Sequence, residues 1–350
     1  MITTPLTRRR LLVGALGAGG LAAVGGLPAC GGPEPAGTAG SAAGPRKVGY
    51  QLSWTHSVQF GGTYLAKERG LFDKLGLDVT LAPGGPNVAG DANTVSGATL
   101  INISASDGVA RSNAQGADLV IIGRQYQKAP GTLLSLGTAP IKTPPELVGK
   151  KVGVAGTDTP ALDAFLTINK LSRDQVTFVP SQYDPAVLTA KQVDAIFCFY
   201  NDLPVALRTK GIEGYSMLLA DFGYNPMSQT YTVLRSSLED ADKRKQVVDL
   251  FRGDAQGWQL YEQDTDAAAD LSVKLYPDAG LDLKTQQEQA KVQLDIMYSA
   301  LTKKEGFGAY TDADVEENIR LFGILGINGS DAKLWDHSIL DEVYANGPTA

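Results

Sequence analysis

The sequence predicts an α/β fold, built either as two domains or as one domain in two lobes. Hydrophobic patterns typical of strands and helices alternate from residue 48 until the chain becomes helical after residue 236. About 300 residues follow the N-terminal segment, which is more than one average domain needs. Hydrophobic side chains make up 43% of the sequence, ample for packed cores.

The first 29 residues have the features of an export signal. Residues 8–10 are three arginines that precede an apolar stretch rich in Gly and Ala, as in twin-arginine leaders. The stretch ends at Leu27-Pro28-Ala29-Cys30, which is similar to a lipoprotein cleavage site. A weak transmembrane helix is the alternative, but the glycines, Pro28 and Cys30 disfavour it. We expect residues 1–29 to be removed and Cys30 to carry a lipid that anchors the protein outside the cell membrane.

The segment that follows Cys30 offers almost nothing to bury. Residues 30–45 are mostly Gly, Ala, Pro and Ser, which predicts a flexible tether between the lipid and a folded part that starts near Arg46. If Cys30 is acylated, Cys198 has no partner for a disulfide. Cys198 lies in an apolar run, and we expect it to be a small buried residue of a strand.

The charge of the mature chain argues against a nucleic-acid partner. Without the three leader arginines, 28 basic and 38 acidic residues remain, a net charge of −10. A nucleic-acid-binding surface needs the opposite sign.

A strand, a turn, a helix and a second strand are predicted for residues 47–82. The turn carries Trp54 and His56, and Phe60 and Tyr64 follow at helical spacing before Gly70 ends the helix. Ligands in open α/β sheets bind just beyond the carboxyl ends of strands, where Trp54 would lie. For His56 we prefer an exposed loop position to a ligand contact.

Polar residues also follow the next strands. The strand at 101–103 leads into Ser104 and Ser106 at a helix start, which could hold a polar ligand group or form a plain helix cap. Tyr126 follows a buried strand at 119–123. Thr157 lies in the turn after the strand at 151–155.

Further strands are predicted at 175–180 and 193–199, and the second of these ends in Tyr200-Asn201-Asp202. An ordinary helix cap is the alternative role for Asn201 or Asp202. Beyond residue 236 the pattern is helical, and we expect Trp258 to be a core residue rather than a ligand contact.

A group of motifs is spread over residues 54–85, and another lies at 145–154. The motifs are Trp54, Gln59-Phe60-Gly61-Gly62, Tyr64-Leu65-Ala66-Lys67, Gly70-Leu71-Phe72, Gly76-Leu77-Asp78-Val79, Pro83-Gly84-Gly85 and residues 145–154. Together they resemble the substrate-binding proteins of ABC importers for thiamine pyrimidine precursors, riboflavin-like heterocycles, sulfonates and nitrate, a family that includes thiamine pyrimidine synthase-like proteins. The resemblance covers residues 47–345.

This resemblance implies a type II periplasmic binding protein fold, with two α/β lobes, crossover strands and a helical C-terminal portion. The first lobe would comprise residues 46–140 and 225–345, with a return strand at 230–234, and the second lobe residues 141–224. Members of the family often place Asn-Glu-Pro at the ligand. Here Asp202 stands in place of the Glu and Leu203 is inserted before Pro204.

The expected function is that of an extracytoplasmic solute-binding lipoprotein. It would be a monomer that binds a small flat heterocycle, a thiamine pyrimidine precursor or a flavin-like ring, and delivers it to an ABC permease. No catalytic residue, metal or cofactor is expected. A sulfonate or nitrate ligand stays open as an alternative because of Arg124 and Lys128. The candidate ligand-binding residues are Trp54, Phe60, Tyr64, Ser104, Ser106, Tyr126, Thr157, Tyr200, Asn201, Asp202 and Tyr224.

An enzyme is the other class to weigh. The resemblance includes the synthase that makes the thiamine pyrimidine from its own His and a pyridoxal phosphate on a Lys, with iron assisting. In this chain Phe60 occupies the position of the reacting His, and only Cys198 represents the Cys-rich run. The sequence holds two His residues, far apart, and no hydrolase, P-loop or dinucleotide motif.

Overall fold

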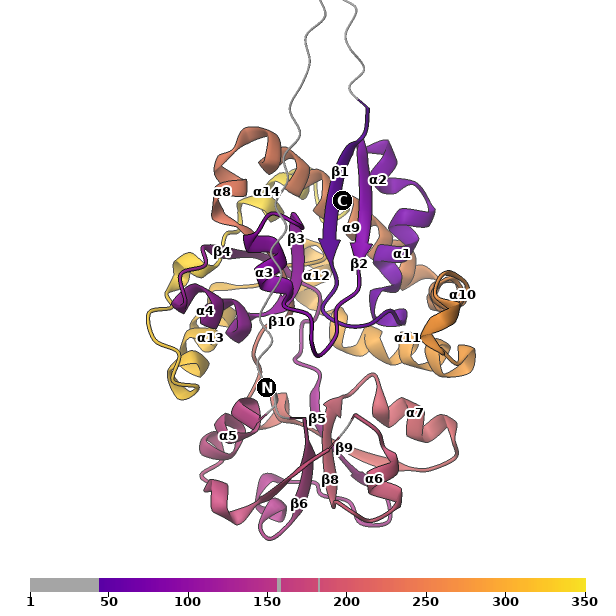
Figure 1. Cartoon of the computed structure of the whole chain (residues 1–350), viewed down its shortest axis with the longest axis vertical. Coiled ribbons are helices and arrows are strands. Elements are labelled where there is room, and N and C mark those ends of the chain that lie inside the picture. The colour runs from indigo at the N-terminus through magenta and orange to yellow at the C-terminus, as the bar shows by residue number, and fades with distance from the viewer. Residues whose placement is uncertain (1–43, 156–158, 182) are drawn as a thin grey trace, which may run out of the picture. The chain divides into compact units, whose positions relative to one another are not determined.

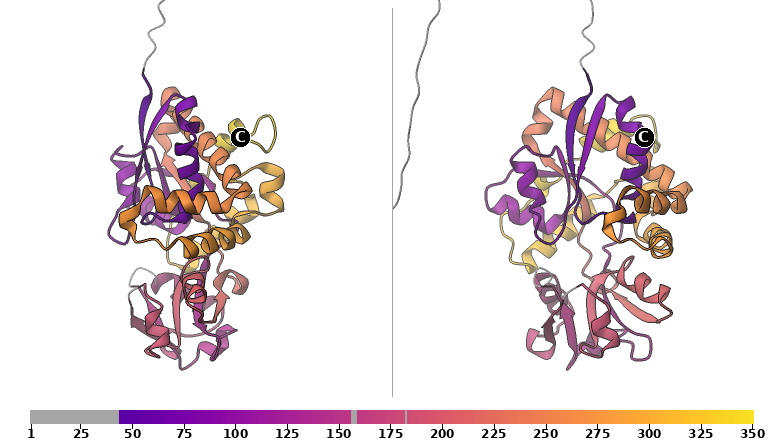
Figure 2. Two further views of the ribbon diagram at one scale, coloured as in Figure 1. Left: turned by 90° about the vertical axis from the view of Figure 1, so that its right-hand side faces the viewer. Right: turned by 45° about the vertical axis from the view of Figure 1, so that its right-hand side comes forward.

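The computed structural model describes residues 44–155, 159–181 and 183–350. The expected signal peptide, Cys30, nearly all of the expected tether and Thr157 lie outside these residues. The described residues form two five-stranded sheets with helices around each, shown in Figures 1 and 2. Within the described ranges, no helix is both long and apolar enough to span a bilayer.

The first sheet has the strand order β2-β1-β3-β10-β4. Its strands are β1 Arg46–Gln51, β2 Leu77–Ala82, β3 Ile101–Ala105, β4 Leu119–Arg124 and β10 Ser228–Leu234. β1 runs parallel to β2 and β3, whereas β10 runs antiparallel to β3 and β4. β10 is the return strand expected at 230–234, and it closes the sheet between segments more than 100 residues away in sequence.

Helices and short 3-10 turns accompany this sheet. They are η1 Val58–Phe60, α1 Gly61–Glu68, α2 Leu71–Lys74, α3 Gly90–Val95, α4 Ser106–Ala114, α8 Arg235–Glu239, α9 Ala241–Gln263, α10 Thr265–Leu275, η6 Pro277–Ala279, α11 Leu283–Met297, α12 Ala300–Glu305, α13 Asp312–Ile324, η7 Ala332–Leu334 and α14 Ser338–Val343. Gly70 ends the α1 segment in a left-handed conformation with φ of 63°, which confirms it as the helix stop.

A buried carboxylate ties α9 to the sheet. Asp254 Oδ2 accepts hydrogen bonds from the Tyr50 hydroxyl at 3.0 Å, the Tyr231 hydroxyl at 2.5 Å and Trp258 Nε1 at 3.1 Å. Burial raises the pKa of Asp254. Trp258 is fully buried, as expected of a core residue.

The second sheet has the order β7-β6-β8-β5-β9. Its strands are β5 Gly131–Leu136, β6 Lys151–Val154, β7 Thr177–Pro180, β8 Ala195–Phe199 and β9 Gly214–Leu218. Its helices are η2 Pro144–Leu147, α5 Thr159–Ile168, η4 Arg173–Gln175, α6 Ala186–Thr189, α7 Leu203–Thr209 and η5 Leu219–Phe222. Cys198 is fully buried in β8, as expected.

The first part of the first lobe ends before residue 131 and not at residue 140, where the sequence predicts its boundary. β5 belongs to the second sheet, where it pairs antiparallel with both β8 and β9. The chain therefore leaves the first sheet after β4 and enters the second by residue 131. Neither β5 nor β9 was expected, because β5 is buried along most of its length and β9 is a short strand at the edge of its sheet.

A helix from the C-terminal region contributes to the core of the second lobe. Leu321 of α13 is fully buried in the hydrophobic cluster that holds Phe165 and Val152, and Ile324 packs against the same cluster. Arg320 Nη2 also donates to the Gly223 carbonyl at 3.2 Å. The last third of the chain thus contacts both lobes.

Candidate functional site

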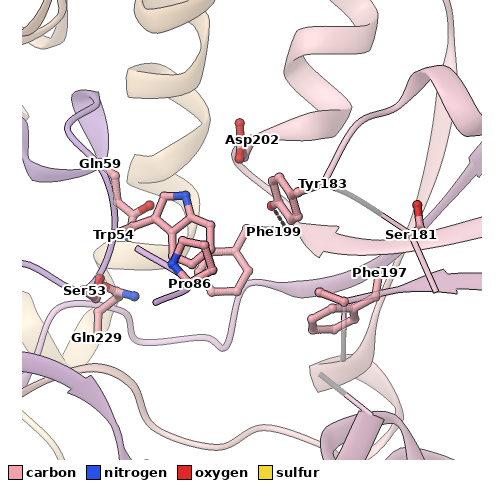
Figure 3. Close-up of a pocket in the computed structure, with 11 residues that line it drawn as sticks. Ser53, Trp54, Gln59, Pro86, Ser181, Tyr183, Phe197, Phe199, Asp202 and Gln229 are labelled. Atoms are coloured by element: carbon pink, nitrogen blue, oxygen red, sulfur yellow. Dashed lines mark hydrogen bonds between the residues drawn. The ribbon is translucent and has the colours of Figure 1, made fainter. Parts of the chain in front are cut away.

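A cavity of about 440 Å³ lies where strands of both sheets end. Residues after β1, β2, β6 and β7 line it, together with the end of β8 and one residue of β10, as Figure 3 shows. The carboxyl ends of parallel strands are the usual ligand sites of α/β sheets. The lining residues are Ser53, Trp54, Gln59, Pro86, Ala155, Ser181, Tyr183, Phe197, Phe199, Asp202 and Gln229.

Aromatic rings from both lobes wall the cavity. The ring of Trp54, from the first lobe, is 38% exposed, and its centroid lies 6.3 Å from that of Tyr183, from the second lobe, at an interplanar angle of 55°. Phe197 and Phe199 are two residues apart on β8, so their side chains leave the strand on the same face. An open ring facing rings of the other lobe is suited to a flat apolar ligand.

Asp202 is the acidic group of the cavity. Its Oδ1 accepts a hydrogen bond from Gln289 Nε2 at 2.7 Å, and its carboxylate also bonds to the Tyr183 hydroxyl. That hydroxyl in turn accepts from the Phe199 backbone N–H at 2.9 Å. Burial raises the pKa of Asp202, and the two hydrogen bonds oppose this rise.

A second hollow of about 180 Å³ shares Trp54, Gln59 and Asp202 with the cavity. Four amide side chains are part of its wall, those of Gln59, Asn201, Gln286 and Gln289. The Val58 N–H donates to Gln286 Oε1, and Gln286 Nε2 donates to Gln289 Oε1, both at 2.7 Å. Because Gln289 then donates to Asp202, the chain of amides points its N–H groups toward the carboxylate.

Two polar atoms at this junction are buried without a hydrogen-bond partner, Gln59 Nε2 and Asn201 Oδ1. The Asn201 side-chain amide donates to Gln293 Oε1 at 3.0 Å and to the Tyr126 hydroxyl at 3.3 Å, so only its oxygen is unpaired. Gln59 lines both hollows and Asn201 lines the smaller one. Buried unpaired polar atoms are costly, and in native proteins they often mark a place that a ligand completes.

The wall of the cavity carries no basic side chain among the described residues. Residues 156–158 and 182, which adjoin Ala155 and Ser181 in the sequence and lie outside the described residues, include no Lys, Arg or His. Arg124 and Lys128, the cations considered for an anionic ligand, form ion pairs elsewhere, with Asp314 at 3.0 Å and Asp221 at 2.6 Å.

The family model described as NMT1/THI5 like matches residues 57–268, more than half of the chain. The chain belongs to the NMT1/THI5-like family. No curated protein matched the sequence.

Solved structures share the type II periplasmic binding protein fold of this NMT1/THI5-like chain. The alkanesulfonate-binding protein SsuA from Xanthomonas axonopodis pv. citri, bound to MOPS, has 16% identity and a TM-score of 0.57, over 83% of this chain and 96% of that protein. A putative periplasmic sulfonate-binding protein SsuA from Methylobacillus flagellatus KT has 13% identity and a TM-score of 0.61, over 86% and 94%.

An enzyme shares the fold as well. The desulfurization enzyme DSZB has 12% identity to this chain and a TM-score of 0.55, over 85% of this chain and 98% of the enzyme. Since binding proteins and an enzyme both use this scaffold, the function of this family member has to be argued from its own site.

Three of the predicted site residues lie at the candidate site of this NMT1/THI5-like protein. Trp54 and Asp202 line the main cavity, and Asn201 lines the adjoining hollow. Phe60 and Tyr64, by contrast, are buried in the core of the first lobe and line neither. They lie on η1 and α1, whose apolar faces pack inward, so their helical spacing indicated core rather than ligand contact.

Four further predicted residues do not line either hollow. Ser106 is fully buried and donates to Asn318 Oδ1 at 2.7 Å. Ser104 pairs with Thr230 in the first sheet. Tyr126 is buried and donates to Gln293 Oε1 at 3.0 Å. Tyr224 lines a different hollow of about 270 Å³ beside Pro226 and Met227, and Thr157 lies outside the described residues.

The expected pairing of Trp54 with Tyr200 across one cavity is wrong. Tyr200 follows Phe199 directly and lines a separate hollow with Pro204 and Arg208. Side chains alternate at the end of β8, so Phe199 points into the cavity and its neighbour points elsewhere. Tyr183 is the ring that faces Trp54 instead.

Several lining residues could have been found from the sequence, and one could not. Ser53 lies two residues after β1 and Ser181 directly follows β7, so the strand-end rule that selects Trp54 would also select them. Gln229 lies within β10 at a β-bulge, with φ of 53°, and its Oε1 accepts from the Ser53 hydroxyl at 2.6 Å. A bulge reorients one side chain of a strand, and no local sequence pattern predicts this bulge.

His56 is half-buried rather than exposed in this NMT1/THI5-like structure. Its ring stacks on Tyr276, with centroids 3.5 Å apart and planes at 8°, and Nδ1 lies 3.0 Å from the Tyr64 hydroxyl. It lines the smaller hollow. Burial lowers the pKa of His56 below its usual 6.5.

This shift predicts a pH-dependent stability. Because the folded-state pKa of His56 is lower than the unfolded one, the unfolded chain binds more protons as the pH falls through 6.5. The contribution of His56 is therefore fully present above pH 6.5 and is lost as the pH drops below it. We expect the free energy of unfolding of His56→Gln to fall less between pH 7.5 and 5.5 than that of the wild type, measured by urea titration at each pH. Parallel curves for the two proteins would contradict the assignment.

Proposed function

We propose that this protein is the solute-binding component of an ABC importer and that its cavity binds a small flat heterocycle, a thiamine pyrimidine precursor or a flavin-like ring. The observation that supports this most is the cavity itself, which is walled by Trp54 and Tyr183 from opposite lobes and closed behind by Phe197 and Phe199. Its volume of about 440 Å³ lies at the lower end of typical ligand pockets, which suits one ring or a few fused rings.

The residues that line the cavity can account for a micromolar affinity for such a ligand. A micromolar Kd corresponds to about 8 kcal/mol. Each aromatic contact adds about 0.5–1.5 kcal/mol beyond the burial of area, and hydrogen bonds to a charged group contribute about 1.5–3 kcal/mol. The four rings and the Asp202 carboxylate, together with the burial of the apolar area of the ligand, can therefore reach this range after part of the gain has offset the ordering of the site.

Ligand binding would stabilise the closed arrangement of the lobes. The chain passes between the sheets at 125–130 and 219–227, and such crossovers act as hinges in two-lobed binding proteins. The bond from Gln289 on α11 to Asp202 at the start of α7 joins the lobes beside the cavity. A permease in the membrane would recognise the closed form and receive the solute unchanged.

We propose binding rather than catalysis. Phe60, at the position of the synthase's reacting His, is 1% exposed and packs edge-on against Tyr64 in the core. Cys198 is fully buried, and burial raises the pKa of its thiol, which disfavours the reactive thiolate. In the same proposal Cys30 carries the lipid, the protein stands on the outer side of the cell membrane as a monomer, and no cofactor is needed.

A ligand panel tests the proposal. The mature chain from residue 30, with Cys30→Ser to keep it free of lipid, is titrated by calorimetry with aminopyrimidines, riboflavin, lumichrome, aliphatic sulfonates and nitrate. We expect at least one ring compound to bind with a Kd near 1 μM or below. Binding of only nitrate or aliphatic sulfonates would refute the heterocycle. A Schiff-base absorbance on mixing with pyridoxal phosphate would instead support the synthase-like enzyme.

A further inference from the structure

We infer that the site selects against anionic ligands and takes a flat compound, neutral or positively charged, that donates hydrogen bonds to Asp202. This inference rests on the proposed function and narrows it to a charge class. It also separates this chain from its sulfonate-binding structural neighbours, whose fold it shares.

The charged groups nearest the ligand position are acidic. A basic residue, Arg111, lines the neighbouring hollow of about 270 Å³ that shares Phe197 and Phe199 with the cavity, and it is paired there with Asp107 at 4.0 Å. Asp202 carries the formal charge of the cavity wall among the described residues, and no Lys, Arg or His lines that cavity. Among the described residues, the smaller hollow adds His56, whose pKa is lowered by burial, which favours the neutral imidazole. An organic anion entering here would lose its hydration beside a carboxylate and gain no cationic partner.

Asp202 is placed to accept more hydrogen bonds than it receives from the protein. An ionised carboxylate offers about four lone-pair sites. Gln289 and the Tyr183 hydroxyl occupy two of them, and both of these donors are neutral. Since Asp202 lines both hollows, its remaining acceptor sites are within reach of a ligand at their junction. A ligand N–H, and above all an ammonium group, would form the charge-assisted bond that the protein leaves unmade.

The junction offers a second acceptor. Asn201 is 4% exposed, and its Oδ1 has no hydrogen-bond partner although both donors of the same amide group are engaged. It lies one residue before Asp202 and lines the smaller hollow. Two neighbouring acceptors suit an amino group that extends from a ring packed against Trp54 and Tyr183.

A matched series of three compounds tests this inference. Each has the 4-amino-2-methylpyrimidine ring and carries at C5 an aminomethyl, a hydroxymethyl or a sulfomethyl group, which makes the substituent cationic, neutral or anionic. Calorimetry on the mature Cys30→Ser protein at pH 7.5 is expected to give the tightest Kd for the amine. We expect the alcohol to bind roughly 10- to 100-fold more weakly. The sulfonate should show no measurable binding.

A substitution of Asp202 then tests whether this residue causes the preference for the amine. Asp202→Asn keeps the size of the side chain and removes its charge, so the Kd of the amine should rise by roughly 10- to 100-fold toward that of the alcohol. The same change at Asp295→Asn, an exposed position of α11, serves as the control and should leave all three Kd values unchanged. Thermal melting of both variants checks that they fold.

The outcomes separate the two proposals. If the sulfonate binds the wild type as well as the amine does, the charge inference is wrong while the ring-binding function stands. If none of the three compounds binds, the proposed pyrimidine ligand fails and the inference fails with it. The three compounds are compared on the wild-type protein, so this test of the inference does not depend on whether a variant folds.

Discussion

Gly62→Ala is expected to lower the free energy of unfolding by about 1–3 kcal/mol, through overpacking between α1 and α9. A Cβ at Gly62 would lie 2.2, 2.4 and 2.6 Å from three ring atoms of Trp258. Trp258 is fully buried and its Nε1 is bonded to Asp254, so the ring cannot swing aside. The higher helix propensity of Ala, worth about 1 kcal/mol, offsets only part of this cost.

Urea denaturation of the mature protein measures this effect, and Gly323→Ala is the matched control. Gly323 lies within α13, and nothing comes within 4 Å of a Cβ built there. The control should therefore be unchanged or more stable by about 0.4–1 kcal/mol. Equal stability of Gly62→Ala and the wild type would show that the two helices do not pack as closely as described. The result also explains part of the family motif at 59–62. Gly62 is required there by the close packing against Trp258 and not by contact with a ligand.

Trp54→Ala is expected to weaken binding of the best ring compound by about 2–3 kcal/mol, or roughly 30- to 150-fold in Kd. The indole is the wall that the first lobe contributes opposite Tyr183. In the free protein it is 38% exposed, so its loss should change stability by only about 0.5 kcal/mol. Trp54→Phe retains a ring and should lose clearly less affinity than Trp54→Ala.

The control for this experiment is Tyr215→Ala. Tyr215 is similarly exposed, at 36%, but it lies on the edge strand β9 and lines a different hollow. Calorimetry with the best compound of the ligand panel should give a Kd close to that of the wild type for this variant. If both alanine variants bind as the wild type does, the ring of Trp54 is not part of the ligand site.

The strand-end rule found part of the site, and it failed where side chains of one strand alternate. Trp54 was selected because it follows β1, and Asp202 because it follows β8. Tyr200 was selected on the same ground, yet it points away while Phe199 lines the cavity. The strand-end rule predicts at which edge of the sheet a residue lies, but it does not predict which face of the sheet its side chain points to. That face depends on the residue at which hydrogen bonding between the strands ends.

The helical residues show a second reason for failure. Phe60 and Tyr64 lie in a motif shared with ligand-binding relatives, but they pack against the helices of the same lobe. Tyr183 was passed over, although it follows β7 at only a short distance. Its place in the cavity wall depends on its contact with Trp54, which lies about 130 residues earlier in the chain. Local sequence patterns do not predict contacts between such distant residues.

By itself the sequence determined the alternation of strands and helices, the return strand β10, the buried Trp258 and Cys198, and the family. These follow from local periodicity and from motifs that each segment carries alone. The tertiary structure alone decided that β5 joins the second sheet and that a bulge turns Gln229 into the cavity. It also decided that, of the residues the structure describes, the cavity is lined by the acidic Asp202 and by no basic side chain. Each of these features depends on which segments, distant in the sequence, pack together. The total apolar surface that the whole chain buries determines that packing.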